Sequence, residues 1–197
     1  MLIREIKEAL QEAGTYLGMP GLYFYVGQGE EMSPEEILAR AEKSFMPHMI
    51  FAGSDPANYP AEISELTERF HDMFRRVCIE TDAQEYLECD ADLFSLRPKL
   101  RSENASGLDL WPADTIERYL KEGKEVQLLV AVGDELDFQE ALIKISQHRL
   151  PRSRVFLLPK GETLEEYRDS AAWLRGECLK YGFRFGERLK FSQAFEG

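Results

Sequence analysis

Residues 22–36 read LYFYVGQGEEMSPEE, a strand pattern followed by a helix start. Its first five residues form an apolar, non-alternating run of the kind found in strands that are covered on both faces. Ser33, Pro34 and Glu36 then supply an N-cap, a first-turn proline and a capping-box glutamate. Residues 27–31, all glycine or polar, form a short link between the two. A strand that runs directly into a helix is the unit of a parallel α/β sheet.

The same unit recurs along the chain and predicts an α/β fold with a mostly parallel sheet. Strands are expected at 22–26, 49–52, 77–80, 93–96, 126–132 and 154–158. Helices are expected at about 2–13, from Ser33, at 60–74, 113–122 and 135–149, and from the Thr163 capping box to Gly182. Residues 101–112 are expected to form a long surface loop. Because no convincing boundary interrupts the pattern, we expect a single domain over residues 1–197.

Composition narrows the classes of function. The chain has 197 residues and a net charge of −12, which opposes binding to phosphate backbones, so nucleic acid is not an expected partner. Neither a membrane span nor a signal peptide can be read in the sequence. Three scattered cysteines favour a reducing compartment over a disulfide framework. The expected location is the cytoplasm.

Polar and charged residues follow three of the predicted strands, where α/β proteins place their ligands. We therefore predict a ligand-binding set at these strand ends and no catalytic or metal-binding residue. The predicted set is Gly53, Ser54, Asp55, Glu80, Thr81, Asp82, Arg97 and Lys99.

Each group also has a structural interpretation. Gly53 to Pro56 could be a plain strand-to-helix turn. Asp82 could cap a helix containing Tyr86 and Leu87. Arg97 and Lys99 could pair with acidic neighbours, for which the candidates are Asp90, Asp92 and Glu80. The sequence leaves these alternatives open.

The order of these segments resembles the 7-carboxy-7-deazaguanine synthases, radical S-adenosylmethionine (SAM) enzymes of the queuosine pathway. Short motifs spread over nearly the whole chain carry the resemblance. They are QEAGTYLGMP at 11–20, AGSDP at 52–56, ETDA at 80–83, RPK at 97–99, GETLEE at 161–166 and CLKYGFR at 178–184. The resemblance implies a shortened, open version, with six strands and three helices, of the partial barrel of radical SAM enzymes. It also implies that the motif at residues 53–56 faces the amino group of SAM.

This sequence differs from the family pattern at the residues that carry the family's chemistry. The family holds a 4Fe–4S cluster in a CxxxCxxC loop after its first strand, where this chain has only residues 27–31. Ala13 stands where the family has a glutamate, and the family's C-terminal tryptophan–glycine–asparagine signature is absent. We therefore expect no cluster and no resident cofactor, with weak SAM binding at most.

The histidines and cysteines offer no replacement site. His48, His71 and His148 lack metal-ligand spacing. Cys78 and Cys178 fall on apolar patterns and are expected in the core. Cys89, between two acidic residues, is expected to be exposed and unreactive.

Three functions remain open. We favour a non-radical binding or partner protein, a pseudoenzyme relative of the synthases. The second is an enzyme with iron-free chemistry through Asp55, Glu80 and Lys99. The third is a structural subunit of a complete radical SAM synthase. The homodimeric assembly of the family implies self-association or pairing with an intact relative.

Overall fold

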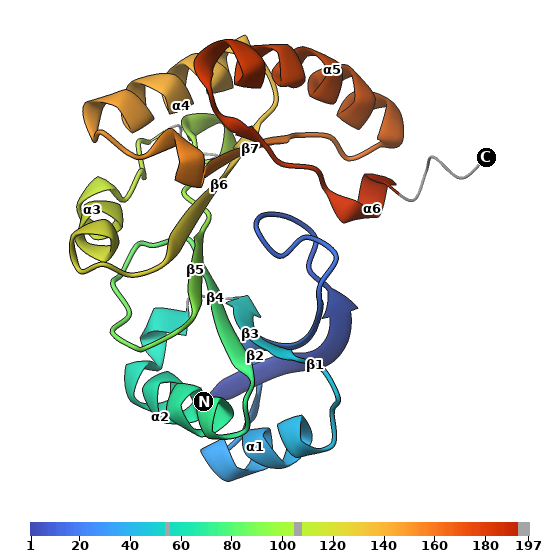
Figure 1. Ribbon diagram of the computed structural model, residues 1–197, viewed down its shortest axis with the longest axis vertical. Coiled ribbons are helices and arrows are strands. Elements are labelled where there is room, and N and C mark those ends of the chain that lie inside the picture. Colours follow the sequence, from blue (N-terminus) through green and yellow to red (C-terminus); the bar gives the residue numbers. More distant parts are fainter. Residues whose placement is uncertain (54–55, 105–107, 193–197) are drawn as a thin grey trace.

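A single sheet organises the chain (Figure 1). The computed structural model describes residues 1–53, 56–104 and 108–192. The sheet's strands follow chain order from β1 to β8, and every neighbouring pair is parallel except β1 with β2. The strands are β1 (Leu2–Leu10), β2 (Pro20–Glu31), β3 (His48–Gly53), β4 (Arg76–Thr81), β5 (Leu93–Leu96), β6 (Val126–Val132), β7 (Val155–Pro159) and β8 (Arg184–Phe185).

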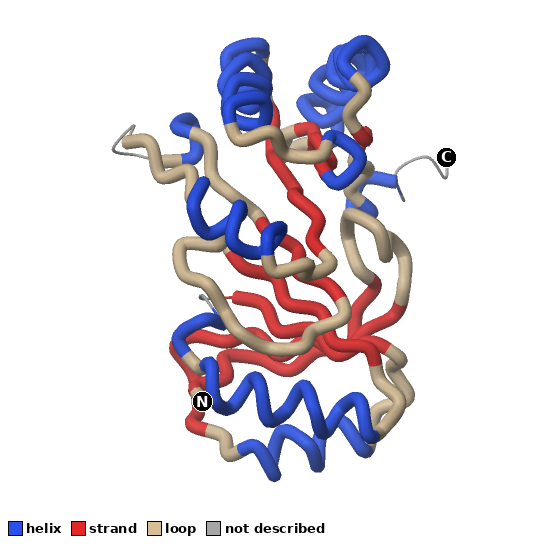
Figure 2. The backbone as a smooth tube through the Cα atoms, turned by 60° about the vertical axis from the view of Figure 1, so that its left-hand side comes forward, coloured by secondary structure: helices blue, strands red, loops and turns tan. Residues whose placement is uncertain are grey.

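Helices cover the outer face of this curved sheet, and the inner face is concave (Figures 1 and 2). They are α1 (Pro34–Glu42), α2 (Pro60–Asp72), α3 (Ala113–Lys121), α4 (Glu135–Gln147) and α5 (Leu164–Tyr181). The short α6 (Leu189–Ser192) lies apart from them, and its Leu189 amide donates to the Glu12 carbonyl of the β1–β2 connection. Three one-turn 3-10 helices, η1 (Pro56–Asn58), η2 (Arg101–Glu103) and η3 (Arg152–Arg154), lie in connections. The predicted α/β class with a mostly parallel, open sheet is confirmed, and the sheet has two further edge strands, β1 and β8.

Alternation along the strands separates two apolar layers. Phe24, Phe51 and Phe70 pack together in the main core between the sheet and the helices. On the concave face, smaller clusters form around Tyr23 with Ile50 and around Leu129 with Phe156 and Leu158. The sheet is therefore buried on its outer face and only partly covered on its inner one.

The connection between β1 and β2, residues 11–19, crosses the concave face. Ala13 packs against the inner side chains of β6 and β7, and the Thr15 amide donates to Gln127 Oε1 at 2.8 Å. Gln11 Nε2 lies 2.8 Å from Nδ1 of buried His48, at the start of β3. This segment thus fills the inner face near the strand beginnings and leaves the strand ends open.

The predicted opening helix is wrong, because residues 2–10 form the edge strand β1. The apolar residues Ile3 and Ile6 are three positions apart, which fits a helix better than a regular strand. A register shift between Ile3 and Glu5 removes the conflict. It lets Ile3 and Ile6 both contact the main core, although they would face opposite sides of a regular strand.

The expected link at residues 27–31 is also strand. β2 pairs Val26 with Ile3, bulges outward, and pairs with Ile3 again through Glu30. Gly27 has φ 150°, and a Cβ on Gly29 would lie 2.1 Å from the Ile3 carbonyl oxygen. Glycine is required here because β1 lies against this backbone.

The other predicted elements are confirmed to within a few residues, including the capping boxes at Ser33 and Thr163. The helix expected around Tyr86 and Leu87 is wrong: β4 is followed by an irregular segment up to β5. There the Leu87 amide donates to the Tyr119 hydroxyl of α3 at 2.8 Å. A tertiary contact that the local sequence does not encode replaces the helix.

Candidate functional site

The predicted ligand-binding residues lie at the carboxyl ends of β3, β4 and β5, which are parallel neighbours. Gly53 ends β3 with φ 102°, and a Cβ there would lie 2.4 Å from the Val26 carbonyl oxygen. Ser54 and Asp55 lie outside the described residues. The other predicted residues lie at the ends of β4 and β5 and in the segments that follow them.

An ion pair joins these two strand ends. Arg97 Nη2 lies 3.2 Å from Glu80 Oε2, and the Arg97 amide donates to the Thr81 carbonyl at 2.8 Å. The Nε of Arg97 is buried and has no hydrogen-bond partner among the described residues. The guanidinium therefore keeps a donor that a ligand or water can satisfy.

The residues flanking this pair are partly engaged. Lys99 Nζ is 3.9 Å from Asp82 Oδ2, a loose and exposed pair. Asp82 Oδ1 accepts from the Gln84 amide at 3.2 Å, so it stabilises a turn rather than a helix start. Buried Thr81 accepts from the Ala83 amide at 3.0 Å. Of the acidic neighbours considered for Arg97, Glu80 is the partner in the structure.

A cavity of about 1020 Å³ opens beside the ion pair, at the ends of β5, β6 and β7. Arg97 and Lys99 are the members of the predicted set in its wall. Sequence reasoning missed the rest of the charged lining, although Asp134 and Lys160 follow strand ends and the strand-end rule could have found them. The other polar and aromatic lining residues are Glu103, Glu162, Glu166, Asp169, Ser170, Trp173 and Arg188.

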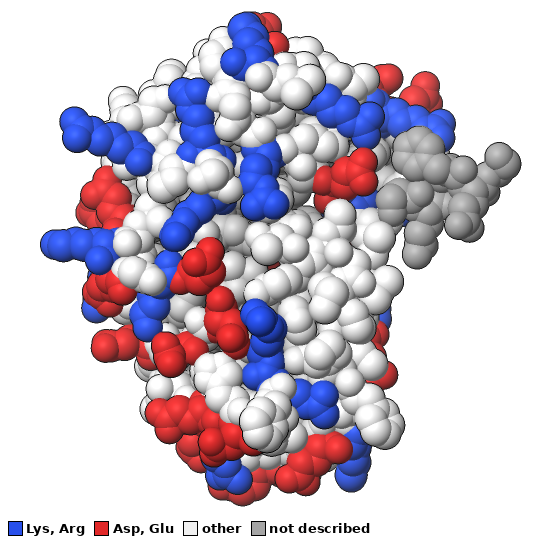
Figure 3. Space-filling model, in the orientation of Figure 1, with Lys and Arg blue, Asp and Glu red and all other residues white. Residues whose placement is uncertain are grey.

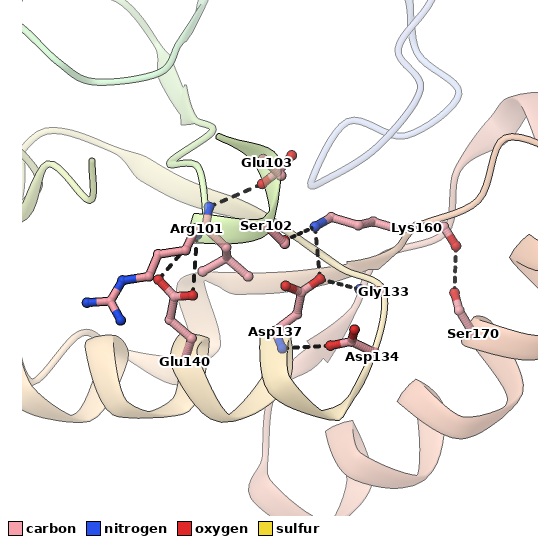
Figure 4. Close-up of polar contacts among 10 residues, drawn as sticks. Arg101, Ser102, Glu103, Gly133, Asp134, Asp137, Glu140, Lys160 and Ser170 are labelled. Carbon is pink, nitrogen blue, oxygen red and sulfur yellow. Dashed lines mark hydrogen bonds and ion pairs between the residues drawn. The ribbon is translucent and has the colours of Figure 1, made fainter. Parts of the chain in front are cut away.

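A hydrogen-bond network holds Lys160 in this wall (Figure 4). Its Nζ donates to Asp137 Oδ2 at 2.8 Å and to Ser102 Oγ at 2.7 Å. Asp137, 5% exposed, also accepts from the Gly133 amide at 2.9 Å. Burial raises the pKa of Asp137, but these hydrogen bonds lower it by more, so the carboxylate stays charged. The network joins η2, the β6–α4 turn and the end of β7 into one rigid wall.

Two tyrosines extend the concave face toward β2. The rings of Tyr23 and Tyr25 stack with centroids 5.5 Å apart. Burial raises the pKa of both hydroxyl groups, and the negative charge of Glu80 raises it further. Both phenols therefore remain neutral hydrogen-bonding groups beside the Glu80–Arg97 pair.

The cysteines are buried and unpaired, each in a different element or loop. Burial raises the pKa of Cys78 to about 12 and that of Cys178 to about 11. Cys89 is 5% exposed, so its predicted exposure is wrong, and burial raises its pKa as well. All three behave as core residues, as Cys78 and Cys178 were expected to do.

The histidines are separated. His71 Nε2 contacts Asp92 at 3.0 Å, and His148 Nδ1 contacts Glu117 at 2.7 Å. Over the part of the chain that the structure describes, no cluster of three His, Cys, Asp or Glu side chains could hold a metal ion.

Acidic and basic side chains are mixed on the face shown in Figure 3, with basic groups more frequent over the half that carries α3, α4 and α5. The cavity lies against this half, at the ends of β5–β7. Within the described ranges, no helix is long and apolar enough to cross a membrane.

This open, curved and mostly parallel sheet, with helices outside and a cleft at the strand ends, is a fold shared with solved structures of low sequence identity. The structure is similar to QueE from Escherichia coli, with a TM-score of 0.73 and 17% identity over 94% of this chain and 92% of that one. SuiB of Streptococcus suis, solved bound to S-adenosylmethionine, gives a TM-score of 0.58 at 12% identity, over 81% of this chain and 44% of SuiB.

Sequence comparison points the same way. The chain is 23% identical over 176 residues to the 7-carboxy-7-deazaguanine synthase of Rhodopirellula baltica, covering 83% of this chain and 67% of that protein. It is 22% identical over 210 residues to the synthase of Pyrobaculum aerophilum, covering 95% and 91%. No family model matches the chain. The predicted resemblance to the 7-carboxy-7-deazaguanine synthases is confirmed.

Proposed function

We propose that the chain is a non-radical binding protein that holds a small charged molecule in the cleft of the partial barrel. One observation carries the proposal. Residues 27–31, where the resemblance implies a cluster loop, belong to a bulged strand tied to β1, while the ends of β5–β7 form a cleft with charged walls.

The chain's own residues do not fit a 4Fe–4S cluster. Such a cluster needs closely spaced thiolates, and residues 27–31 contain no cysteine. The thiols elsewhere are buried, with pKa values raised, so they favour the neutral form rather than the thiolate that binds iron. No step of the proposed function therefore passes through a cluster.

The cleft suits a ligand that carries both charges, because acidic and basic side chains are mixed in its wall. Arg97, Lys99 and Arg188 supply positive charge and Asp169 negative charge, and Trp173 offers an aromatic surface. S-adenosylhomocysteine and SAM have this chemistry. Without iron to chelate the methionine end, hydrogen bonds of about 1 kcal/mol each remain, so we expect a dissociation constant of about 1 mM, roughly 4 kcal/mol.

Binding is favoured over iron-free catalysis because Glu80 is already paired with Arg97. A carboxylate held by a guanidinium is a poor general base. The Glu80–Arg97 pair instead presents a fixed, polarised surface to a ligand.

Two experiments test the proposal. First, anaerobic reconstitution with iron and sulfide should leave the protein colourless and without stoichiometric iron, whereas a bound cluster would refute the non-radical function.

Second, calorimetry with S-adenosylhomocysteine should show weak binding that Lys99→Ala and Arg188→Ala each reduce several-fold. Lys121→Ala on α3 is the matched control, because this exposed lysine lies outside the cleft. Binding unaffected by the cleft variants would place the ligand elsewhere.

A partner role is the second candidate, and two exposed aromatic residues favour it. Phe45 is 90% exposed and Phe74 is 96% exposed with φ 57°, a conformation that is costly for a bulky residue. Arg75 joins their two loops by donating to the Ser44 and Met46 carbonyls. Phe74→Ser should weaken co-purification with a co-expressed intact synthase, and Leu179→Ser on α5, where the leucine is also highly exposed, should not.

A further inference from the structure

Lys160 lines the cleft, but its charge is already used inside the protein. It directly follows β7 and reaches the cavity at the strand ends, which is where α/β proteins commonly bind the phosphate groups of their ligands. Its Nζ donates to Asp137 Oδ2 at 2.8 Å and to Ser102 Oγ at 2.7 Å (Figure 4). Because an ammonium group has three donors, at most one is left for a ligand.

The Asp137 carboxylate takes the position that an anionic group of a ligand would occupy. One of its oxygens, Oδ2, accepts from Lys160 and, at 2.9 Å, from the Gly133 amide. A lysine and a backbone amide that converge on one oxygen form a strong anion-binding arrangement. Gly133 and Lys160 both line the cavity, whereas Asp137 itself is only 5% exposed. The protein thus holds an anion of its own at this point of the wall.

The remaining wall is negative. Arg97 is paired with Glu80 at 3.2 Å, and Lys99 lies 3.9 Å from Asp82. Three of the four basic side chains that line the cavity, Lys160 included, therefore already face a carboxylate. The wall also carries five carboxylates of its own, those of Glu103, Asp134, Glu162, Glu166 and Asp169. The wall therefore repels a phosphate dianion.

We propose that Asp137 determines which ligands the cleft accepts. By neutralising Lys160 it excludes phosphorylated molecules and restricts the cleft to ligands of neutral or positive net charge that lack a phosphate group. A phosphate could pair with Lys160 only by leaving the buried carboxylate without its partner, which is unfavourable. This inference deepens the proposed binding function and rests on it, because it concerns the ligand of the same cleft.

Calorimetry with inorganic phosphate tests the proposal. Wild type should show no binding at millimolar phosphate. In Asp137→Ala, Lys160 and the Gly133 amide are released beside the cavity, so phosphate should bind at least about tenfold more tightly than any binding to wild type. The double variant Asp137→Ala/Lys160→Ala should lose this binding again. Phosphate should also raise the melting temperature of Asp137→Ala more than that of wild type, because it would bind only to the folded state.

Two further variants keep the experiment decisive. Asp137→Ser also removes the carboxylate and leaves room for the anion, and it should gain phosphate binding even if alanine at this position fails to fold. Glu135→Ala is the matched control, because it removes an exposed carboxylate from the same turn of α4 without changing the surroundings of Lys160. It should gain no phosphate binding. Circular dichroism and thermal melting verify that each variant is folded.

Other results would overturn the proposal. Phosphate binding by wild type that Lys160→Ala weakens would mean that the lysine is open to ligands. Folded Asp137 variants that gain no phosphate binding would mean that the carboxylate does not exclude the anion. An equal gain in Glu135→Ala would mean that only net charge matters. A gain in the Asp137 variants, with no binding of S-adenosylhomocysteine to wild type, would instead refute the proposed function and leave the role of Asp137 intact.

Discussion

The end of β2 and the ends of β5–β7 lie on the same edge of one sheet but differ in what they offer a ligand. At its end, β2 stays in the sheet as a bulged strand in which Gly29 is packed against β1. After β5, β6 and β7, turns project Lys99, Asp134 and Lys160 into a cavity. The same edge of the sheet therefore offers closed backbone packing at β2 and an open, charged cavity at β5–β7.

The largest expected effect is at the packed β2 end. Gly29→Ala should lower the free energy of unfolding by about 2–3 kcal/mol, because the new Cβ would lie 2.1 Å from the Ile3 carbonyl and β1 must shift. Urea unfolding measures the change.

Gly176→Ala is the matched control. This glycine lies inside α5, and an added Cβ would have no neighbouring atom within 4 Å, so alanine should stabilise the helix by about 0.5–1 kcal/mol. Equal changes in the free energy of unfolding would mean that the β2 end accepts a side chain as readily as an open surface. The end of β2 would then not be closed by packing.

The next prediction concerns the rigid wall at the β6 and β7 ends. Asp137→Asn should cost about 1–3 kcal/mol near neutral pH, because Lys160 loses its buried charged partner. The pKa of Asp137 is lowered in the folded state, so its contribution is complete above the unfolded pKa of about 3.9 and is lost as the pH falls through the folded pKa.

Unfolding by urea at neutral and at strongly acidic pH measures this linkage. The difference between wild type and Asp137→Asn should shrink in acid. Asp90→Asn, at an exposed position in the β4–β5 segment, should show little difference at either pH. A difference that persists unchanged in acid would mean that the carboxylate charge does not stabilise the wall.

Sequence patterns predicted the parallel strands β2 to β7 because each is a short apolar run, and the capping boxes at Ser33 and Thr163 marked the starts of α1 and α5. They failed at β1, where a register shift makes apolar residues three positions apart face one side, and after β4, where Tyr119 holds the chain out of a helix. At the site, strand ends located Glu80 and Arg97 but not Arg188 or Trp173. These two reach the cavity from elements distant in sequence, and no local pattern marks them.

A smaller effect is expected where the two regions meet, at the Glu80–Arg97 pair. A double-mutant cycle of Glu80→Gln and Arg97→Met should give a coupling energy of about 1 kcal/mol, because the pair lies at 3.2 Å but the arginine remains partly exposed. Urea unfolding of the four proteins measures it. Zero coupling would mean that the pair does not help to position the strand ends.

The smallest expected effect is electrostatic and crosses from the β4 end to β2. Burial is the largest cause of the raised pKa of Tyr25, and the charge of Glu80 is the second. Glu80→Gln should therefore lower the pKa of Tyr25 toward its ordinary value while burial keeps it raised. The ultraviolet absorbance of tyrosinate, followed against pH and assigned by comparison with Tyr25→Phe, measures the shift.

Glu85→Gln, at an exposed position in the β4–β5 segment, serves as the control and should leave the titration unchanged. If Glu80→Gln also leaves the pKa of Tyr25 unchanged, the charge of Glu80 at the end of β4 does not affect β2. The two regions are then electrostatically independent.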